Sequence, residues 1–593
     1  MTVDLTTSFG EILDTPSIFP TQEGEIEVII SNDGDSTFTG STDLALYAST
    51  DSDLEKSDLN INEGSSIDVL DGQDEVLTVQ NDDGTIGTIP VNDLNLAPGE
   101  STTINLDFSS SDLRTPSVIA PGAYYLIAEV DPNSTISEDS DNNRASQFVS
   151  TDGSNVVQDW NSVFLNAVQA SGADSYGFGS PESGGDGTIP PVVPRNGALL
   201  HTAIFDTAVA FEGGFEPFAV DSSAPEVASV EAAIVGAAFT ILSSEEVYSE
   251  QTADFEAQRE RSLAEIDADE AEKTSGFEFG VSVANELLAS RASDFTTPPS
   301  DVFEPTNQPG AWRPIIDGEE QIPVGPQFES VPPFFIDSTQ AFRPDGPPQF
   351  GSDDFANETE ETRMKGGIEN TEDTNITRTE EETEIAQFWS YDRTDTFRPP
   401  GHWNQIAQEA ILQNQEDGGE ELSLVETARL FAQLNIALTD AGVVSWDSKF
   451  DFNQLRPEQT INADPENEII PQPGFDLDNI DGNDISEQDP NWDPLIETPP
   501  FPDYTSGHAS FGAAAAEVLE SVFGDDFGIE ITSQDIPGIS RSYGSFSEAA
   551  TENGRSRVFG GIHIDSSSVE GLESGFEIGQ FVADNALAPT DTM

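Results

Sequence analysis

Apolar and polar residues alternate along roughly the first 150 positions in the pattern that is typical of β-strands with one buried face. The alternation is clearest in GEIEVIISNDG (24–34), TDLALYAS (42–49), LAPGESTTINLDF (96–108) and GAYYLIAEVD (122–131). Gly, Asp and Asn, which favour turns, lie between these runs, and no helical period interrupts them. The pattern therefore predicts a β-sandwich over residues 1–150.

After about residue 155 the apolar positions recur with the period of an amphipathic helix. In the segment 511–524, one apolar stripe is formed by Phe511, Ala515, Val518 and Val522. The same spacing recurs at 196–212, 230–244, 251–266 and 423–446. The pattern predicts a second, mainly α-helical domain of bundle type over residues 155–590, and a length of 593 residues agrees with more than one domain.

Loops interrupt the helical region at three places. Proline-rich or acidic stretches lie at 171–195, 295–350 and 458–503. The segment 352–384 is rich in Glu, Asp and Thr, and we expect it to be a solvated or mobile loop excursion rather than an active element.

The charge of the chain excludes several classes of partner. It carries 112 Asp and Glu against 21 Lys and Arg, a formal net charge of −91, which argues against nucleic acid and anionic membranes as partners. It has no cysteine, so disulfide and thiolate chemistry are absent. The opening MTVDLTTSFGEILD lacks the basic start and apolar core of a classical signal peptide, and no apolar run is long enough to span a bilayer. We expect an extracellular or cell-surface protein, exported without such a signal.

In so acidic a chain, the few cations that accompany histidines are conspicuous. Lys449 and Arg456 lie seven positions apart in SWDSKFDFNQLRP (445–457), so in a continuous helix they would share one face and could point at one anion. Arg557 precedes His563 by six residues, in RSRVFGGIHID (555–565). Each signal alone is weak, because an arginine is usually a surface ion pair and a lone histidine is usually structural.

A Pro-rich loop meets the start of a helix at Ser506, Gly507 and His508, within PPFPDYTSGHASFGAAAAEVLE (499–520). A helix N-terminus offers free backbone N–H groups and the positive end of the helix dipole, which suit an oxyanion. Gly507 would allow the backbone to approach such a ligand closely. The sequence thus adds an anion-binding turn and a second candidate histidine to the two segments that carry the cations, and the three segments form one ordered constellation.

That constellation resembles the signature of the vanadium-dependent haloperoxidases and of the related type 2 phosphatidic acid phosphatase-like acid phosphatases. The likeness continues through RPPGHWNQIA (398–407), LFAQLNIALTDAGVVSWDSKF (430–450), NWDPLIETPPFPDYTSGHASF (491–511) and SFSEAATENGRSRVFGGIH (545–563). It looks like the bacterial haloperoxidase-like branch over roughly 155–590. The resemblance implies an all-α domain of two four-helix bundles that holds vanadate.

The same resemblance implies a role for each site residue. The oxygens of vanadate would be bound by Lys449, Arg456, Ser506, Gly507 and Arg557. His563 would bond vanadium through a neutral ring nitrogen, and His508 would be the general acid/base. Lys449 would also polarise bound hydrogen peroxide, so that a halide attacks it and hypohalous acid leaves to halogenate small organic substrates.

Two aromatic residues bear on the halide. Trp446 and Phe501 fall where the chloroperoxidase type has an aromatic pair, whereas bromoperoxidases tend to carry His at the position of Phe501. An apolar pocket that strips water from the halide favours the harder oxidation. The alternative is that both are ordinary core aromatics.

At one position the chain departs from the superfamily pattern. The Asp that usually follows the last histidine by four residues, and orients its imidazole, is replaced by Ser567. Asp565, two residues after His563, is the candidate substitute.

The N-terminal region has a resemblance of its own. The pieces LAPGES, GAYYLIAEVDP and ISEDSDNNR are similar to the bacterial cell-adhesion-related domain, an immunoglobulin-like sandwich, which implies a surface or adhesion accessory. DPNSTISEDSDNN (131–143) could hold calcium through its carboxylates, although its spacing is not that of an EF-hand loop; a polar turn is the alternative.

Three functions therefore stay open at this stage. The first is a vanadate-dependent haloperoxidase. The second is an acid phosphatase that uses the same oxyanion site through a phosphohistidine, because phosphate and vanadate share shape and charge. The third is a catalytically inactive exported adhesion or matrix protein. The preferred halide, the organic substrate and the oligomeric state do not follow from the sequence.

Overall fold

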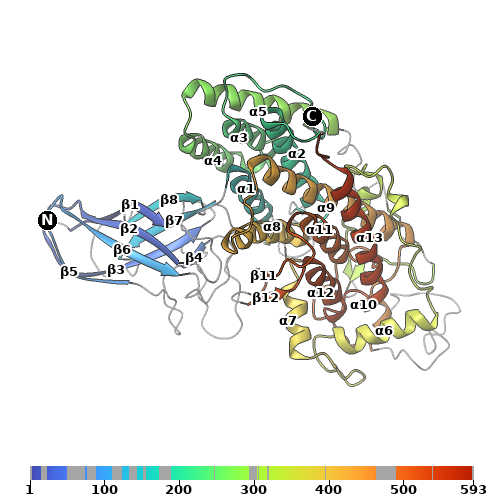
Figure 1. Ribbon diagram of the computed structural model, residues 1–593. Helices are drawn as coiled ribbons and strands as arrows, with labels where there is room; N and C mark the ends of the chain where they lie inside the picture. The colour runs from blue at the N-terminus through green and yellow to red at the C-terminus, as the bar shows by residue number, and fades with distance from the viewer. Residues whose placement is uncertain are drawn as a thin grey trace. The chain divides into compact units, whose positions relative to one another are not determined.

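The structure of the protein is a computed structural model, drawn in Figure 1. The residues that it describes are 3–14, 23–49, 74–76, 89–109, 123–131, 143–150, 155–171, 188–245, 247–292, 303–304, 306, 308–316, 319–393, 396–462, 489–536 and 539–590. The chain divides into two units, one of Met1–Ala167 with Thr532–Ser540 and one of Val168–Ile531 with Arg541–Met593. Most of α1 (Val156–Ala170) falls in the first unit. The predicted domain limits of 1–150 and 155–590 stay predictions.

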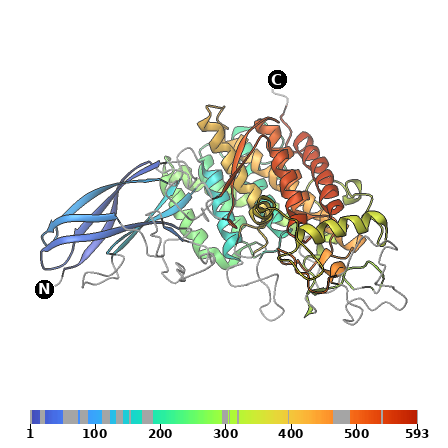
Figure 2. The same ribbon diagram turned by 90° about the horizontal axis from the view of Figure 1, so that it is seen from below.

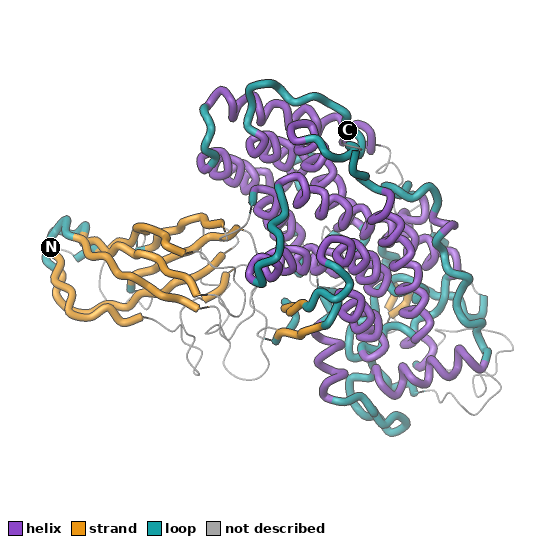
Figure 3. The backbone as a smooth tube through the Cα atoms, in the orientation of Figure 1, coloured by secondary structure: helices purple, strands orange, loops and turns teal. Residues whose placement is uncertain are grey.

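The first unit contains two antiparallel sheets, whose strands are orange in Figure 3. One sheet has the order β1-β2-β6, with bounds Leu5–Asp14, Glu23–Asn32 and Ser101–Ser109. The other has the order β4-β3-β7-β8, with bounds Asp74–Val76, Phe38–Ser49, Ala123–Val130 and Arg144–Ser150, and β5 (Ile89–Leu96) pairs with β3. In β2 every second residue is buried, as with Val28 and Ile30, whereas β3 buries Leu44, Ala45 and Leu46 in succession.

The alternating pattern therefore predicted the β-structure of the N-terminal region correctly. Its assignment as an immunoglobulin-like sandwich stays a prediction. Most of the candidate calcium segment 131–143 lies outside the described residues, so calcium binding stays a prediction too.

The second unit is a large helical region, coloured purple in Figure 3. Its helices are α2 (Val192–Glu212), α3 (Val230–Leu242), α4 (Thr252–Glu265), α5 (Glu270–Arg291), α6 (Asp353–Gly366), α7 (Glu380–Phe388), α8 (Arg398–Glu416), α9 (Leu424–Phe452), α10 (Pro457–Ile461), α11 (Gly507–Phe523), α12 (Phe546–Phe559) and α13 (Asp565–Asn585). Two short hairpins accompany them, β9 (Ile315–Ile316) with β10 (Glu319–Glu320) and β11 (Ile529–Thr532) with β12 (Ser540–Tyr543). The helical expectation is confirmed, and the finer division into two four-helix bundles stays a prediction.

The close approach of α11 and α13 explains how the C-terminal segments meet. These helices, orange to red, lie side by side in Figures 1 and 2. Gly571, Gly575 and Gly579 recur every four residues on the face of α13 that meets α11. A Cβ at Gly575 would lie 2.4 Å from the carbonyl oxygen of Ser510, so only glycine permits this packing distance. The start of α13 is thereby brought to the start of α11.

The acidic segment 352–384 differs from its expectation. Residues 353–366 form α6, which begins with Ser352 as N-cap and packs against α12. Thr362 donates a hydrogen bond to the carbonyl of His563 (3.1 Å), and Glu358 accepts one from the backbone N–H of Ser566 (3.0 Å). The expectation of a solvated excursion is therefore wrong here, because the inward face of α6 is bonded to the turn that carries His563.

One buried carboxylate ties a loop to the central helix α9. Asp440 is fully buried and accepts hydrogen bonds from the backbone N–H groups of Phe334 (2.5 Å), Phe335 (2.9 Å) and Ile336 (2.9 Å). Burial raises its pKa to about 6, and the three hydrogen bonds oppose that rise. The carboxylate is thus the partner of three backbone donors, those of Phe334 and Ile336 in buried hydrogen bonds and that of Phe335 in a partly buried one.

We expect Asp440→Ala to lower the free energy of unfolding by about 2 kcal/mol, because it leaves buried N–H groups without acceptors. Asp451→Ala is the matched control on the same helix, because Asp451 is 46% exposed and pairs with Arg343 at 2.7 Å, an interaction expected to contribute under about 1 kcal/mol. Denaturant unfolding monitored by far-UV circular dichroism measures both. Equal stability of the two variants would contradict the assignment.

No helix in the described ranges combines the length and the apolar character needed to cross a membrane.

Candidate active site

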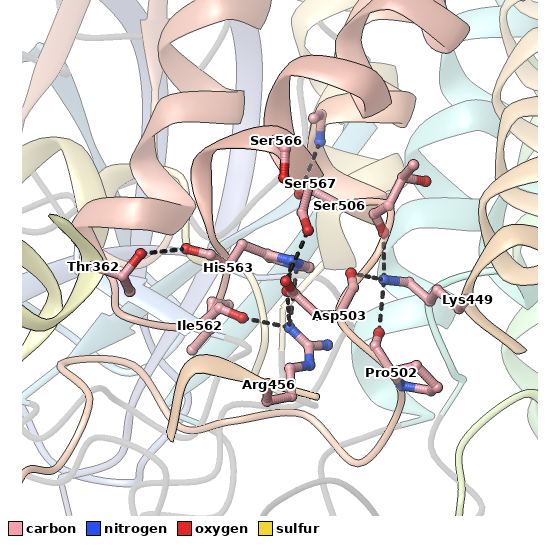
Figure 4. Close-up of polar contacts among 12 residues, drawn as sticks. Thr362, Lys449, Arg456, Pro502, Asp503, Ser506, Ile562, His563, Ser566 and Ser567 are labelled. Carbon is pink, nitrogen blue, oxygen red and sulfur yellow. Dashed lines mark hydrogen bonds and ion pairs between the residues drawn. The ribbon is translucent and has the colours of Figure 1, made fainter. Parts of the chain in front are cut away.

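Three stretches of the second unit supply the side chains of the candidate site (Figure 4). They are the end of α9 with the start of α10, the loop 501–506 with the first turn of α11, and the end of α12 with the turn before α13; the segment after α7 adds Ser390 and Asp392. Helix α9 ends at Phe452, because Asn453 adopts a left-handed conformation (φ 49°, ψ 45°), and Arg456 is the N-cap of α10. The expectation that Lys449 and Arg456 share one helical face is therefore wrong. The helix is interrupted between them, and both still lie beside Asp503.

Lys449 is fully buried and holds the loop 501–506 by its backbone. Its ammonium donates to the carbonyls of Pro502 (3.2 Å), Asp503 (3.0 Å) and Thr505. Burial, and then the charge of Arg456, hold the pKa of Lys449 well below its ordinary value, with Asp503 opposing the shift. A nearby anion would restore the charged form, so the site favours anion binding beside this lysine.

Arg456 is fully buried and has a donor to spare. Its Nε donates to the carbonyl of Phe501 (2.8 Å), and its Nη1 donates to the carbonyl of Ile562 (2.7 Å) and lies 3.2 Å from Nε2 of His563. Burial lowers its pKa to about 10. Among the described residues, its Nη2 has no hydrogen-bond partner. A buried guanidinium nitrogen without an acceptor costs free energy, so this geometry suits an oxyanion.

Arg557 is the third buried cation, near the end of α12. Its Nη1 pairs with Asp392 (3.1 Å), its Nη2 donates to the carbonyl of Ala386 (2.9 Å) and its Nε donates to the hydroxyl of Ser556 (2.9 Å). These bonds fix the guanidinium in one orientation. Because Asp392 also lies 4.0 Å from Nε2 of His508, it couples this arginine to the candidate base.

His508 lies in the first turn of α11 and is nearly buried. Its Nε2 is 2.7 Å from the carbonyl oxygen of Ser390. A carbonyl can only accept a hydrogen bond, so Nε2 carries the proton and Nδ1 carries the lone pair of the neutral ring. Burial, and then the charge of Arg557, hold the pKa of His508 well below its ordinary value. The ring is therefore neutral and can act as a base through Nδ1.

His563 lies in the turn before α13, and its surroundings differ from those expected. Its Nδ1 contacts Oδ1 of Asp503, and burial followed by the charge of Arg456 holds its pKa well below the ordinary value. Asp565, the expected substitute for the missing carboxylate, instead bonds Arg555 (2.5 Å). The hypothesis about Asp565 is therefore wrong, because its side chain is bonded to Arg555 and Asp503 is the carboxylate that contacts His563.

Ser506 and Gly507 form the expected helix start. The hydroxyl of Ser506 accepts a hydrogen bond from the backbone N–H of Ala509 (3.5 Å), and its own N–H donates to the carbonyl of Ser567 (2.8 Å). A Cβ at Gly507 would lie 3.2 Å from the ring of Trp446. The lack of a side chain therefore lets α11 begin directly against this ring.

Trp446 and Phe501 lie together beside the cations. Their ring centroids are 5.2 Å apart, and both side chains are buried. The Nζ of Lys449 is 5.0 Å from the Phe501 centroid, and Cζ of Arg456 is 4.8 Å from it. This places an apolar wall at the edge of the cationic cluster.

The structure thus gathers the residues that the sequence singled out, although their roles are not tested by it. Three residues were missed, namely Asp503, Asp392 and Ser390. Asp503 was visible as a lone carboxylate in the loop PPFPDYTSGH, and Asp392 and Ser390 precede RPPGHW without any spacing that could reveal them. The other two histidines lie elsewhere, His201 stacked on Phe431 (5.1 Å) and His402 on Tyr391 (4.0 Å).

The charges of the site favour an anion. Three cations, Lys449, Arg456 and Arg557, face two carboxylates, Asp503 and Asp392, and both histidines are neutral. Arg456 and Arg557 pair with these carboxylates, and the ammonium of Lys449 has only backbone carbonyls as hydrogen-bond partners among the described residues, which favours binding of an anion beside it. A buried excess charge is costly unless a counter-ion binds, and a small oxyanion supplies one.

Comparisons with known proteins agree with this geometry. Residues 429–591 match the family model described as the VCPO second helical-bundle domain. The chain is 26% identical over 431 residues to the vanadium chloroperoxidase of Curvularia inaequalis, an alignment that covers 62% of this chain and 66% of that protein, just under two thirds of its length.

Solved structures add evidence about the fold. The crystal structure of the first bacterial vanadium-dependent iodoperoxidase aligns with a TM-score of 0.58 and 22% identity, over 74% of this chain and 98% of that one. The CARDB domain of a Pyrococcus furiosus protein aligns over 25% of this chain and 89% of its own, with 17% identity and a TM-score of 0.15, too low to identify the type of β-unit. The resemblance of the helical region to the vanadium haloperoxidases is confirmed.

Proposed function

We propose that this protein is a vanadate-dependent haloperoxidase, which oxidises chloride or bromide with hydrogen peroxide to hypohalous acid that halogenates small organic molecules. The observation that carries the proposal is the burial of Lys449, Arg456 and Arg557 around two neutral histidines in a chain of net charge −91. Such a cluster favours an anionic partner. The similarity to vanadium chloroperoxidase supports vanadate as that anion.

The residues present fit vanadate. The unpaired Nη2 of Arg456 is a donor for one of its oxygens, and Arg557 and Lys449 supply further positive charge. The hydroxyl of Ser506 and the N–H of Gly507 lie at the N-terminus of α11, where anions are favoured. Nε2 of His563 is the nitrogen that would bond the metal. When bound, vanadate supplies Lewis-acid activation of hydrogen peroxide without a change of oxidation state.

The chain's own residues would provide the proton chemistry and the dry environment. Nδ1 of His508 takes a proton from hydrogen peroxide, while the carbonyl of Ser390 holds the ring in place. The halide attacks one oxygen of hydrogen peroxide and the O–O bond breaks. Lys449 stabilises the negative charge that develops on the other oxygen as it leaves. Trp446 and Phe501 exclude water from the halide, so that its negative charge is less well solvated and more reactive.

The deciding experiment is halide oxidation by the purified protein loaded with orthovanadate. Hydrogen peroxide is supplied with chloride, bromide or iodide, and halogenation of a dimedone-type acceptor is followed by its absorbance. We expect turnover that depends on vanadate and is lost when vanadate is removed with a chelator. Absence of turnover with all three halides would contradict the proposal.

One observation favours a second candidate, an acid phosphatase. Asp503 contacts Nδ1 of His563, which is the arrangement that activates a histidine as a nucleophile toward phosphorus. His508 would then protonate the leaving group. Hydrolysis of a phosphate ester by the vanadate-free protein, inhibited by added vanadate, together with no halide oxidation, would identify this activity.

The aromatic pair leads to an expectation about halide preference. We expect Phe501→Leu to reduce chloride turnover by about tenfold more than bromide turnover, because a looser pocket admits water to the halide. Phe511→Leu is the matched control: Phe511 is also buried and packs on Trp446, with centroids 6.2 Å apart, but no cation lies over its ring among the described residues. Steady-state kinetics with both halides measure the ratio. An equal loss with both halides would contradict a role for Phe501 in the halide pocket.

A further inference from the structure

Asp503 is a fully buried carboxylate in the loop before α11, and each of its oxygens lies against a neighbouring side chain. Oδ1 contacts Nδ1 of His563, and Oδ2 accepts a hydrogen bond from the hydroxyl of Ser567 (2.7 Å), as Figure 4 shows. Its nearest cation is Arg456, whose Nη1 is 3.7 Å from Oδ1. The carboxylate therefore connects the histidine to the serine that stands four residues after it.

These contacts select one tautomer of His563. Nη1 of Arg456 is a donor and lies 3.2 Å from Nε2, which favours the lone pair on Nε2, and the carboxylate beside Nδ1 favours the proton there. The proton of the neutral ring then sits on Nδ1, where it faces the carboxylate of Asp503. This is the only neutral tautomer in which Nε2 can bond a metal or attack an electrophile.

The backbone of Asp503 is held from two sides, which fixes the direction of its side chain. Its N–H donates to the carbonyl of Gln454 (3.1 Å), and its carbonyl accepts from the ammonium of Lys449 (3.0 Å). The loop thus cannot turn the carboxylate away from His563 without breaking its bonds to Lys449 of α9 and to Gln454, just after that helix.

Ser567 complements Asp503 in a way that a carboxylate could not. A serine at 567 donates a proton to Oδ2, whereas an aspartate there would place a second negative charge against the first in a site without water. The serine in place of the usual Asp is therefore explained by the presence of Asp503. One carboxylate serves the histidine, and it arrives from a different segment.

We propose that Asp503 is the positioning residue of His563, that Ser567 holds Asp503 in place, and that the pair together replaces the carboxylate missing from position 567. The part of this inference that concerns vanadate binding rests on the function proposed above. The part that concerns the tautomer of His563 stands on the contacts alone.

The tautomer is tested without vanadate. Only four histidines occur in the chain, so histidine labelled with ¹⁵N gives a sparse NMR spectrum, and the spectrum of His563→Gln identifies the signals of His563. We expect Nδ1 to carry the proton in the wild-type protein. We expect Asp503→Ala to shift His563 toward a mixture of tautomers, and Asp503→Asn, which keeps an acceptor oxygen, to retain the wild-type form.

Vanadate binding is tested by titration calorimetry on the same proteins. We expect Asp503→Ala to weaken vanadate binding by about 10- to 100-fold, as is typical when the partner of a ligating histidine is lost. The double variant Asp503→Ala/Ser567→Asp should recover most of this loss, because the carboxylate introduced at position 567 replaces the one lost from position 503. Asp565→Ala is the matched control, since Asp565 is only two residues from His563 but bonds Arg555, and it should bind as the wild type does.

Each outcome decides between the alternatives. An unchanged His563 tautomer in Asp503→Ala, or equal losses of affinity in Asp503→Ala and Asp565→Ala, would overturn the inference. If Asp503→Ala does not fold, Asp503→Asn and Ser567→Ala replace it. A Ser567→Ala protein that binds vanadate as tightly as the wild type would contradict the role proposed for Ser567. Failure of the wild-type protein to bind vanadate, with the tautomer result intact, would reject the proposed function and leave the positioning role standing.

Discussion

Replacing His508 with alanine is expected to lower vanadate-dependent halide oxidation by about 10²- to 10⁴-fold, the range that general acid/base groups contribute. Vanadate affinity should change little, because Nε2 of His508 is bonded to Ser390 and the cations that bind the oxyanion are other residues. The structural reason for the loss is that Nδ1 of His508 carries the lone pair that accepts the proton of hydrogen peroxide. Steady-state kinetics and calorimetry of the same preparations separate the two effects.

The pH dependence gives a second view of the same residue. Burial and Arg557 lower the pKa of His508, so the neutral base persists as the pH falls below the ordinary histidine value of about 6.5. The acid limb of kcat/KM should therefore lie below that pH and disappear in His508→Gln. His201→Gln, which changes a buried histidine outside the site, is the control. Full activity in His508→Ala, or an unchanged acid limb, would remove this residue from the mechanism.

Arg456→Ala is expected to weaken vanadate binding by about 10³-fold, which corresponds to roughly 4 kcal/mol. The change removes the only guanidinium nitrogen of the site that lacks a partner among the described residues, and it also removes the donor to Nε2 of His563. Arg456→Lys keeps the charge but not the forked geometry, so it should recover only part of the affinity.

Arg555→Ala is the matched control for this measurement. Arg555 lies on α12 two residues before Arg557, is partly exposed, and pairs with Glu361 and Asp565. Its loss should leave the affinity for vanadate close to that of the wild type, because exposed ion pairs contribute little. Equal losses in Arg456→Ala and Arg555→Ala would mean that only net charge matters, which would contradict the geometry proposed for the site.

Much of the fold could be predicted because local periodicity decides it. The apolar stripe at 511–524 is the core face of α11, and the segment 423–446 is the body of α9. The ends were harder to predict, since α9 continues to Phe452 and then stops at a single left-handed residue, Asn453. Helix α6 was missed because its apolar content is low and its stability comes from bonds to a segment about 200 residues away, as between Thr362 and His563.

The candidate site was predictable to the extent that its residues keep a spacing along the chain. Lys449, Arg456, His508 and His563 have this property, and the structure brings them together. Asp503 and Asp392 do not, because their importance comes only from the direction in which the folded chain points them. Asp565 shows the converse, since it lies near His563 in sequence and turns to Arg555 in space. Sequence proximity identified the cations and could not identify the carboxylates.

The burial of the three site cations has a kinetic consequence in a chain of net charge −91. An anion that diffuses toward the site meets a negative potential first, because the positive charges are hidden behind acidic surface. Salt weakens that repulsion, as the Debye length falls from about 10 Å at 0.1 M to about 3 Å at 1 M. Halide and oxyanion should therefore enter faster in brine than in dilute buffer, the reverse of the behaviour of an enzyme that attracts its anionic substrate with a basic surface.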